Sequence, residues 1–299
     1  MGKTREIKKR IKAVGNIRRI TNTMRMIATS KFARAQQRAT ATKPYTEGVF
    51  ELVQQIATNL GGSGSEITHP LINGPTEQPK GTARAVTLIV TSDRGLCGPY
   101  NGSVLRTAMA HMRNNAQAKA GEIEIVGRKG AAFLKFNNVA VSKQHALGDK
   151  PDYRDIERIA QSYMDRFTRG EIASVHVVFM KFISAGRQRA EVMQLLPLQP
   201  PAAKQPAGSQ PKQAVEYEFS PPAAQLLGAL LPAAVKSTLN QAINDAIVSE
   251  HIARMVAMKS ATDNAGKMGK YLTRQYNRAR QAQITTELTE IISGAAALE

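Results

Sequence analysis

Apolar residues recur at alternating three- and four-residue spacing through the first 60 residues, and this spacing constrains the fold more than any other feature. It begins in REIKKRIKAVGNIRRITNTMRMIATSKFARAQQR (residues 5–38) and continues through GVFELVQQIATNL (residues 48–60), which is followed by Gly61 and Gly62. Such spacing is typical of helices that supercoil against a partner helix. A straight helix of about 55 residues would span roughly 80 Å, more than the width of a small domain. The sequence therefore predicts a long helix that pairs with another helix.

The same stretch carries a one-sided charge. Thirteen Lys and Arg residues lie between Lys3 and Lys43, and Glu6 is the only acidic residue before Glu47. The whole chain has a formal net charge of +18. Because charged side chains are rarely buried without a partner, most of this helix surface must face solvent, a polyanion or an acidic protein.

A second apolar stripe runs from Pro221 almost to Glu299. The charge there is nearly balanced, with eight basic and six acidic residues from Lys236 onward. Pro222 suits a first helical turn, whereas Pro232 is expected to kink or restart the helix. We expect this helix to pair antiparallel with the N-terminal helix as a coiled coil, with the basic residues facing outward. The stripe consists of Leu239, Ile243, Ala246, Ile247, Ala253, Val256, Ala261, Met268, Leu272, Ala279, Ile284, Leu288 and Ile291.

Strands and helices alternate between residues 84 and 198, which predicts a small central α/β domain. The strand-like runs are ARAVTLIV, EIEIVG, NVAVS, ASVHVVFMKFI and RAEVMQLLPL, and the helix-like runs are residues 102–120, RKGAAFLKF and DYRDIERIAQSYMDRFTRG. This alternation implies a largely parallel, Rossmann-like sheet. We expect a linker at 61–83 and a Pro-rich loop at 199–220 to separate this domain from the terminal helices, residues 1–60 and 221–299.

The turn TSDRGLCGPYN follows a strand and precedes a helix, where glycine-rich loops often hold phosphate. It matches neither GxGxxG nor GxxxxGK[ST], so we interpret it as a structural turn, with Gly95 and Gly98 giving backbone freedom and Asp93 or Asn101 capping. Cys97 is the only cysteine, which excludes an internal disulfide. No histidine or carboxylate is linked to it by sequence, so a structural thiol is favoured over a nucleophile.

The remaining polar residues do not indicate a catalytic, cofactor or metal site. The five histidines have no metal-ligand spacing. In SEHIARM, residues Glu250, His251 and Arg254 share one helical turn. An acid–base pair is one reading of this group, and a polar cluster near the junction of helix and domain is the favoured one.

Two function classes follow from the basic paired helices. One is a structural subunit that binds an acidic protein partner. The other is a basic coiled-coil adaptor or nucleic-acid-binding protein. The charges are interleaved with the apolar stripe, unlike those of a basic-region dimer, and Phe32 is the only aromatic residue before Tyr45. These features argue against nucleic acid. No apolar run reaches the ~20 residues of a membrane span, and no signal peptide is evident.

Several long segments identify a family. The segments IKKRIKAVGNIRRITNTMRMIATSKFARAQ, TSDRGLCG, SEHIARMVAMKSATDNA and NRARQAQITTELTEIISGAAAL resemble the gamma subunit of the rotary F-type ATP synthase, from end to end and in the same order. The resemblance implies a non-catalytic central shaft without a cofactor. Its partners would be the alpha and beta subunits of the hexamer, the epsilon subunit and the c-subunit ring, with no nucleic acid. The location would be peripheral, on the cytoplasmic face of a bacterial plasma membrane, with membrane contact only through the complex.

The resemblance also implies particular contact residues. Arg280, Gln281 and Thr285 match positions that contact the beta subunit near the top of the shaft, and Met24 lies on the opposing N-terminal helix. The sequence departs from the family at GPYN, where two glycines and a leucine usually follow the cysteine. The cysteine pair that serves redox control in chloroplast members is absent, so we expect no thiol switch.

Overall fold

The computed structural model describes residues 2–62, 69–74, 84–198 and 223–296. The expected Pro-rich loop at 199–220 lies outside these residues, as does most of the expected linker at 61–83. Two compact units make up the chain. We call residues 1–31 and 254–299 the terminal unit, and residues 32–253 the central unit.

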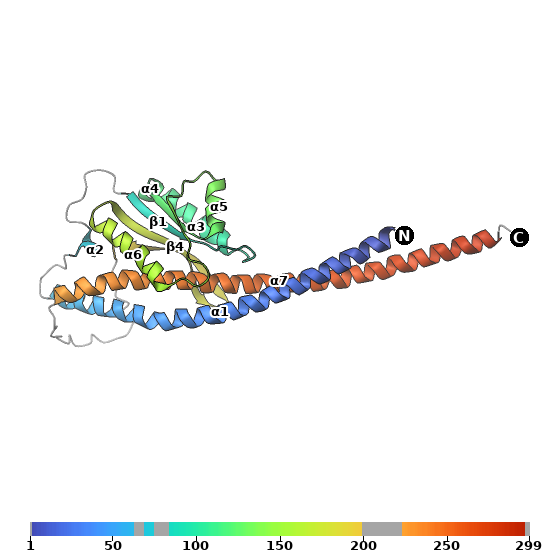
Figure 1. The fold of residues 1–299 in the computed structure, drawn as a ribbon, viewed down its shortest axis with the longest axis horizontal. Helices are drawn as coiled ribbons and strands as arrows, with labels where there is room; N and C mark the ends of the chain where they lie inside the picture. The colour runs from blue at the N-terminus through green and yellow to red at the C-terminus, as the bar shows by residue number, and fades with distance from the viewer. Residues whose placement is uncertain (1, 63–68, 75–83, 199–222, 297–299) are drawn as a thin grey trace. The chain divides into compact units, whose positions relative to one another are not determined.

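Two long helices, α1 (Gly2–Gly62) and α7 (Ala223–Ala296), contribute to both units. Within the terminal unit they run side by side in opposite directions (Figure 1). The hydroxyl oxygens of Thr21 and Thr262 lie 2.9 Å apart, and Thr4 Oγ1 donates to Gln283 Oε1 at 3.1 Å. Residues that come later in α1 thus meet residues that come earlier in α7. The predicted antiparallel pairing is confirmed.

The central unit holds a five-stranded sheet with the order β3-β2-β1-β4-β5. Strands β3, β2, β1 and β4 are parallel to one another, and β5 is antiparallel to β4. This confirms the prediction of an α/β fold with a largely parallel sheet. The strands are β1 (Arg84–Val90), β2 (Glu122–Val126), β3 (Lys143–His145), β4 (Ile172–Ser184) and β5 (Arg187–Leu196). The shorter helices are α2 (Pro70–Asn73), α3 (Tyr100–Asn114), α4 (Ala116–Lys119), α5 (Arg128–Phe136) and α6 (Tyr153–Thr168).

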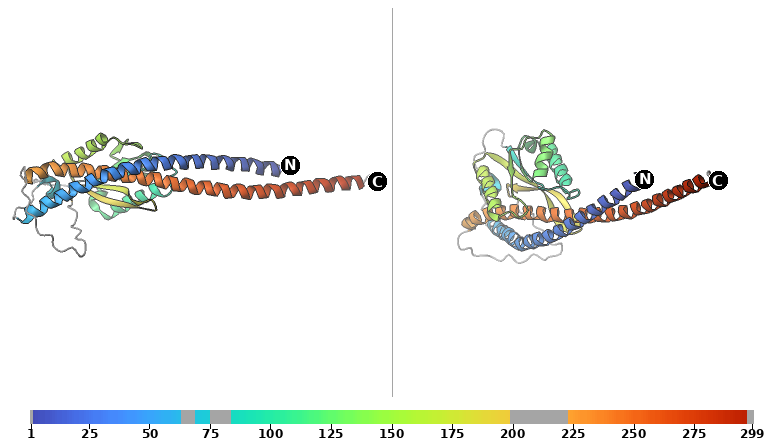
Figure 2. Two further views of the ribbon diagram at one scale, coloured as in Figure 1. Left: turned by 90° about the horizontal axis from the view of Figure 1, so that it is seen from below. Right: turned by 45° about the vertical axis from the view of Figure 1, so that its right-hand side comes forward.

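Helices cover both faces of this sheet (Figure 2, right). Val86 and Leu88 of β1 point into a core that α6 shares with α1 and α7 residues of the central unit, including Val53 and Leu239. Ile89 points the other way, into a core formed with α3 and α5. The alternation arises because successive side chains of a strand face opposite sides of the sheet.

The predicted position of the third strand, at NVAVS, is wrong. NVAVS, residues 138–142, contains no strand, and β3 begins at Lys143 instead. Asn138 has a φ of 54°, and the amide of Val139 donates to the Leu134 carbonyl at 2.9 Å, so this stretch completes the end of α5. Its valines pack against the core from there. The β-branched residues Val139 and Val141 therefore follow a helix end and do not form a strand.

Pro232 does not restart the helix, because α7 passes through it without interruption. Its missing amide leaves the Gly228 carbonyl without its helical donor. Gly228 is exposed, so water can supply that hydrogen bond. Leu231, Ala234 and Val235 are buried on either side and hold the helix against the domain.

Candidate partner-binding surface on the terminal unit

The terminal unit buries very few of its apolar side chains. One buried cluster consists of Val14, Ala265 and Leu272, with Ile11 packed against them, and Ala28 and Met258 are buried as well. Two helices alone offer each other only one narrow face, so the remaining apolar residues stay at the surface. Any partner that covers them gains the free energy of removing that area from water, about 25 cal/mol per Å².

On α1, four large apolar side chains form an exposed stripe. Ile17, Ile20 and Ile27 are 51%, 55% and 52% exposed, and Met24 is 37% exposed. Their spacing of three, four and three residues places them on one helix face. A stripe of this kind is typical of a docking surface for protein.

A second exposed stripe lies near the end of α7. It consists of Ile284, Leu288, Ile291 and Ile292, whose exposed fractions run from 55% to 69%. Val256, Met268 and Tyr271 are exposed further back on the same helix, each at 54%. We call these residues and the α1 stripe together the shaft stripes.

Between the two helices lies an open groove of about 1040 Å³. Gly15, Gly266 and Gly269 line it and leave it open because they carry no side chains. A Cβ at Gly266 would come within 3.7 Å of Arg18 Nε. The groove is lined by four basic residues and one acidic residue: Arg18, Lys267, Lys270, Arg274 and Asp263. Its chemistry favours an acidic partner segment.

The charge of the terminal unit supports the same reading. Residues 1–31 contain ten Lys and Arg and one acid, and residues 254–299 contain seven Lys and Arg and four acids. Glu6, the one acid among residues 1–31, pairs with Arg10 at 2.5 Å. The excess positive charge is thus free to attract acidic groups over a distance of about a Debye length.

The three residues expected to contact a beta subunit lie at the surface of α7. Arg280, Gln281 and Thr285 are all exposed. The Thr285 hydroxyl donates to the Gln281 carbonyl at 3.0 Å, which ties it to its own helix. It therefore offers a partner an acceptor rather than a free donor.

Met24 does not lie opposite these three residues. The Thr21–Thr262 contact places it near the level of Met258 and Thr262, whereas the Thr4–Gln283 contact places Arg280 near the first turns of α1. The roughly 20 residues between these levels correspond to about 30 Å of helix. The sequence stripe reveals which residues face a partner helix but not the level at which they meet. The groove did have a sequence signal in Gly15, Gly266 and Gly269, which a search for apolar stripes does not detect.

The turn at residues 91–101 is held by its own side chains. Asn101 Oδ1 accepts from the Ser92 amide at 3.0 Å, and Asn101 Nδ2 lies 3.3 Å from Cys97 Sγ. The expected cap exists at Asp93, but it serves α5: Asp93 Oδ1 accepts from the Arg128 amide at 3.1 Å. Cys97 is 2% exposed, consistent with a structural thiol.

Backbone strain in this turn falls at Leu96 as well as at glycine. Leu96 has a φ of 64° and Gly98 a φ of 56°, whereas Gly95 has no positive φ. Leu96 is also 61% exposed. Leucine avoids the left-handed region, so the network around Asn101 must impose it.

The SEHIARM group does not form an exposed acid–base pair. Glu250 and His251 are buried in the central unit, at 8% and 2% exposure. Beside them, Ser249 Oγ donates to the Met180 carbonyl at 3.2 Å. Arg254 belongs to the terminal unit. Among the described residues, no three His, Cys, Asp or Glu side chains are grouped as metal ligands, and no helix is long and apolar enough to span a membrane.

Comparison with known proteins agrees with the fold and with the resemblance. A family model described as ATP synthase matches residues 3–298. The ATP synthase gamma chain of Rhodopirellula baltica is 39% identical over 303 residues, which cover 100% of both chains.

Solved structures share the fold at lower identity. A chain of the Euglena gracilis mitochondrial ATP synthase (OSCP/F1/c-ring, rotational state 3) has a TM-score of 0.63 at 17% identity and covers 99% of this chain and 95% of that one. A chain from the rotor of the same organism's enzyme has a TM-score of 0.60 at 16% identity and covers 95% and 99%.

Proposed function

The chain belongs to the ATP synthase gamma chain family, and on that basis we propose that it is the central-stalk rotor subunit of an F-type ATP synthase. It couples proton-driven rotation to ATP synthesis or hydrolysis on the beta subunits. The chain itself is non-catalytic and binds no cofactor. The complex holds it at the cytoplasmic face of a bacterial plasma membrane.

The observation that carries this proposal is the exposure of the shaft stripes on a basic two-helix unit. A coiled coil that displays Ile20 and Leu288 to water, at 55% and 57% exposure, needs a surrounding partner. A ring of alpha and beta subunits supplies apolar walls for the stripes and acidic segments for the groove. The central unit then serves as the foot, against the epsilon subunit and the c-subunit ring.

The contacts with beta must be weak enough to break at each step of rotation. Arg280 offers a planar fork of donors to a carboxylate, and Gln281 offers both a donor and an acceptor. Exposed contacts of this kind contribute on the order of 1 kcal/mol each. Met24, about 30 Å away along the pair, serves a different level of the ring.

Co-purification of the tagged full chain from its native membranes tests the proposal. We expect alpha, beta and epsilon subunits in a fixed ratio that survives a salt wash, because the shaft stripes bind through apolar area. Recovery of nucleic acid that is released by salt, without these subunits, would instead identify a basic nucleic-acid-binding protein. A low-resolution image of the complex would then place the chain inside or outside the ring.

A further inference from the structure

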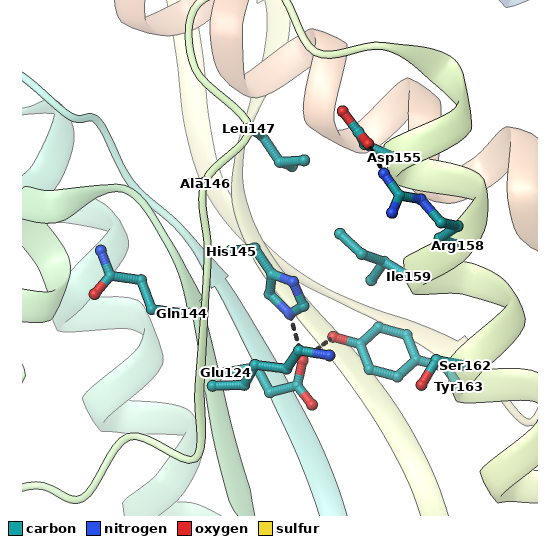
Figure 3. Close-up of a pocket in the computed structure, with 11 residues that line it drawn as sticks. Glu124, Gln144, His145, Ala146, Leu147, Asp155, Arg158, Ile159, Ser162 and Tyr163 are labelled. Carbon is teal, nitrogen blue, oxygen red and sulfur yellow. Dashed lines mark hydrogen bonds and ion pairs between the residues drawn. The ribbon is translucent and has the colours of Figure 1, made fainter.

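A polar pocket of about 300 Å³ opens at the edge of the sheet in the central unit, between β3 and α6. Figure 3 shows His145 from β3 and Tyr163 from α6 converging on Glu124 of β2, with Leu147 and Ile159 above them. This volume lies at the lower end of the range for ligand sites, roughly 300–1,000 Å³. It suits a compact ligand.

The carboxylate at the back of the pocket, Glu124, has three hydrogen-bonding neighbours. Glu124 Oε2 lies 2.5 Å from His145 Nε2 and accepts from the Tyr163 hydroxyl at 2.8 Å, while Arg166 Nη1 lies 3.4 Å from Oε1. Burial alone would raise the pKa of Glu124, but the hydrogen bonds from His145 and Tyr163 and the nearby positive charge outweigh it and lower that pKa. Glu124 therefore stays ionised, and its charge is matched by its neighbours.

Several donors around the pocket are not used up. Within the described residues, the Lys143 ammonium group and the Ser162 hydroxyl have no hydrogen-bond or ion-pair partner. Arg158 pairs with Asp155 but keeps further N–H groups, since a guanidinium carries five. The wall thus offers spare donors on Lys143, Ser162 and Arg158, whereas Glu124 and one oxygen of Asp155 already have partners.

This imbalance determines the charge of a suitable ligand. Lys143 and His145 lie on the same face of β3 as Glu124 does on β2, because Lys143 is in register with Glu124 and His145 is two residues further on. Ser162 and Arg158 approach from α6. A cation would meet carboxylates that already bind His145, Tyr163 and Arg158. An oxyanion would meet several unpaired donors at once.

We propose that this pocket is a binding site for a compact oxyanion the size of inorganic phosphate, held by Lys143, Ser162 and Arg158 beside His145. The site is independent of the shaft stripes, because all of its residues belong to the central unit. Phosphate bound there links β3 to α6 and stiffens the sheet edge at which β3 has no further neighbour.

The test is a titration of the purified full chain with inorganic phosphate, followed by calorimetry and by the NMR signals of labelled histidines. We expect one site with a dissociation constant on the order of 1 mM, and a shift of the His145 signals as the site fills. Lys143→Gln should weaken binding about tenfold, since it removes a charged donor. Ser162→Ala should weaken binding about threefold, as expected for one neutral hydrogen bond.

Lys150→Gln is the matched control, because Lys150 is exposed and does not line the pocket. An equal loss of affinity in Lys143→Gln and Lys150→Gln would reveal general attraction to a chain of net charge +18 and would overturn the proposal. A wild-type chain that shows no saturable binding would also overturn it. AMP is expected to bind less tightly than phosphate, and tighter binding of AMP would refute a compact free anion in favour of a nucleotide.

Discussion

Gln241 Nε2 donates to Asp245 Oδ1 at 2.9 Å, one turn further along α7, while Gln241 Oε1 accepts from the Thr42 hydroxyl of α1 at 3.0 Å. Burial raises the pKa of Asp245 to about 6, although the Gln241 hydrogen bond and the charges of Lys181 and Lys43 oppose the rise. At neutral pH the Asp245 carboxyl group is therefore ionised at a free-energy cost, which the Gln241 hydrogen bond and the two lysine charges offset only in part.

Asp245→Asn is expected to stabilise the full chain at pH 8. The folded-state pKa of about 6 lies above the ordinary value of 3.8, so the native state holds its proton more tightly than the unfolded chain. The stabilisation from that proton is present below about pH 4 and is lost as the pH rises through about 6. The variant should therefore gain on the order of 2 kcal/mol at pH 8 and nothing near pH 4.

Thermal unfolding at several pH values measures this gain. Asp263→Asn is the matched control, because Asp263 is exposed on the same helix. A gain for Asp245→Asn that is the same at pH 4 and pH 8 would show that the carboxyl charge is not the cause.

A Thr21→Cys, Thr262→Cys pair is expected to form a disulfide or a short cross-link readily, because the two hydroxyls are 2.9 Å apart. Thr21→Cys with Thr273→Cys is the control, since Thr273 lies 11 residues, or about 16 Å, further along α7. Gel mobility of the oxidised chains separates the two. Equal reaction of both pairs would mean that the helices slide or pair in another register.

The triple variant Arg280→Ala, Gln281→Ala, Thr285→Ala is expected to assemble normally but to show slower ATP-driven turnover and weaker coupling. The buried residues Val14, Ala265 and Leu272 are untouched, so the helix pair should persist. Three exposed contacts of about 1 kcal/mol each would be lost.

Assembly, ATPase rate and proton pumping per ATP are the measurements for the triple variant. Thr286→Ala is the control, because Thr286 is exposed and lies on a different side of the helix from all three residues. Normal pumping at the normal rate would reject the proposed contacts with beta, and failed assembly would assign these residues to structure.

Cys97→Ser is expected to leave ATPase activity of an assembled complex within about tenfold of normal, a difference of roughly 1.4 kcal/mol in barrier. The smaller hydroxyl can keep the contacts that Cys97 Sγ makes with Asn101 and Ser92, now 3.3 and 3.6 Å long. Asn101→Ala removes the centre of the network instead and should lower the melting temperature. Activity lost in Cys97→Ser without a change in melting temperature would indicate chemistry in this turn.

The sequence predicted the long helices and the sheet well because both depend on periodicity. RKGAAFLKF coincides with α5, and the helical stripe of DYRDIERIAQSYMDRFTRG with α6. The prediction of a strand at NVAVS was wrong. A β-branched run this short shows no clear period, and these residues complete the end of α5 instead.

Sites that depend on long-range register could not be read from the sequence. The family resemblance implies that Met24 and Gln281 both contact the beta subunit, yet the contacts of Thr21 and Thr4 place them at different levels of the helix pair. The polar pocket had no sequence signal either, because Glu124 meets His145 and Tyr163 from 21 and 39 positions away.

The helix pair of the terminal unit joins residues 241 positions apart, and this separation imposes an order on biosynthesis. Domains fold as units while the chain emerges from its N-terminus. Residues 1–31 are made before the central unit, yet their partners at 254–296 are made after it. The central unit can therefore fold while residues 1–31 still lack their partner helix, with Ile17, Ile20 and Ile27 in water. Residues 1–31 carry ten basic residues and one acid, so the unpaired first helices of neighbouring nascent chains repel one another. The charge that we propose for partner binding therefore also protects the nascent chain from aggregation.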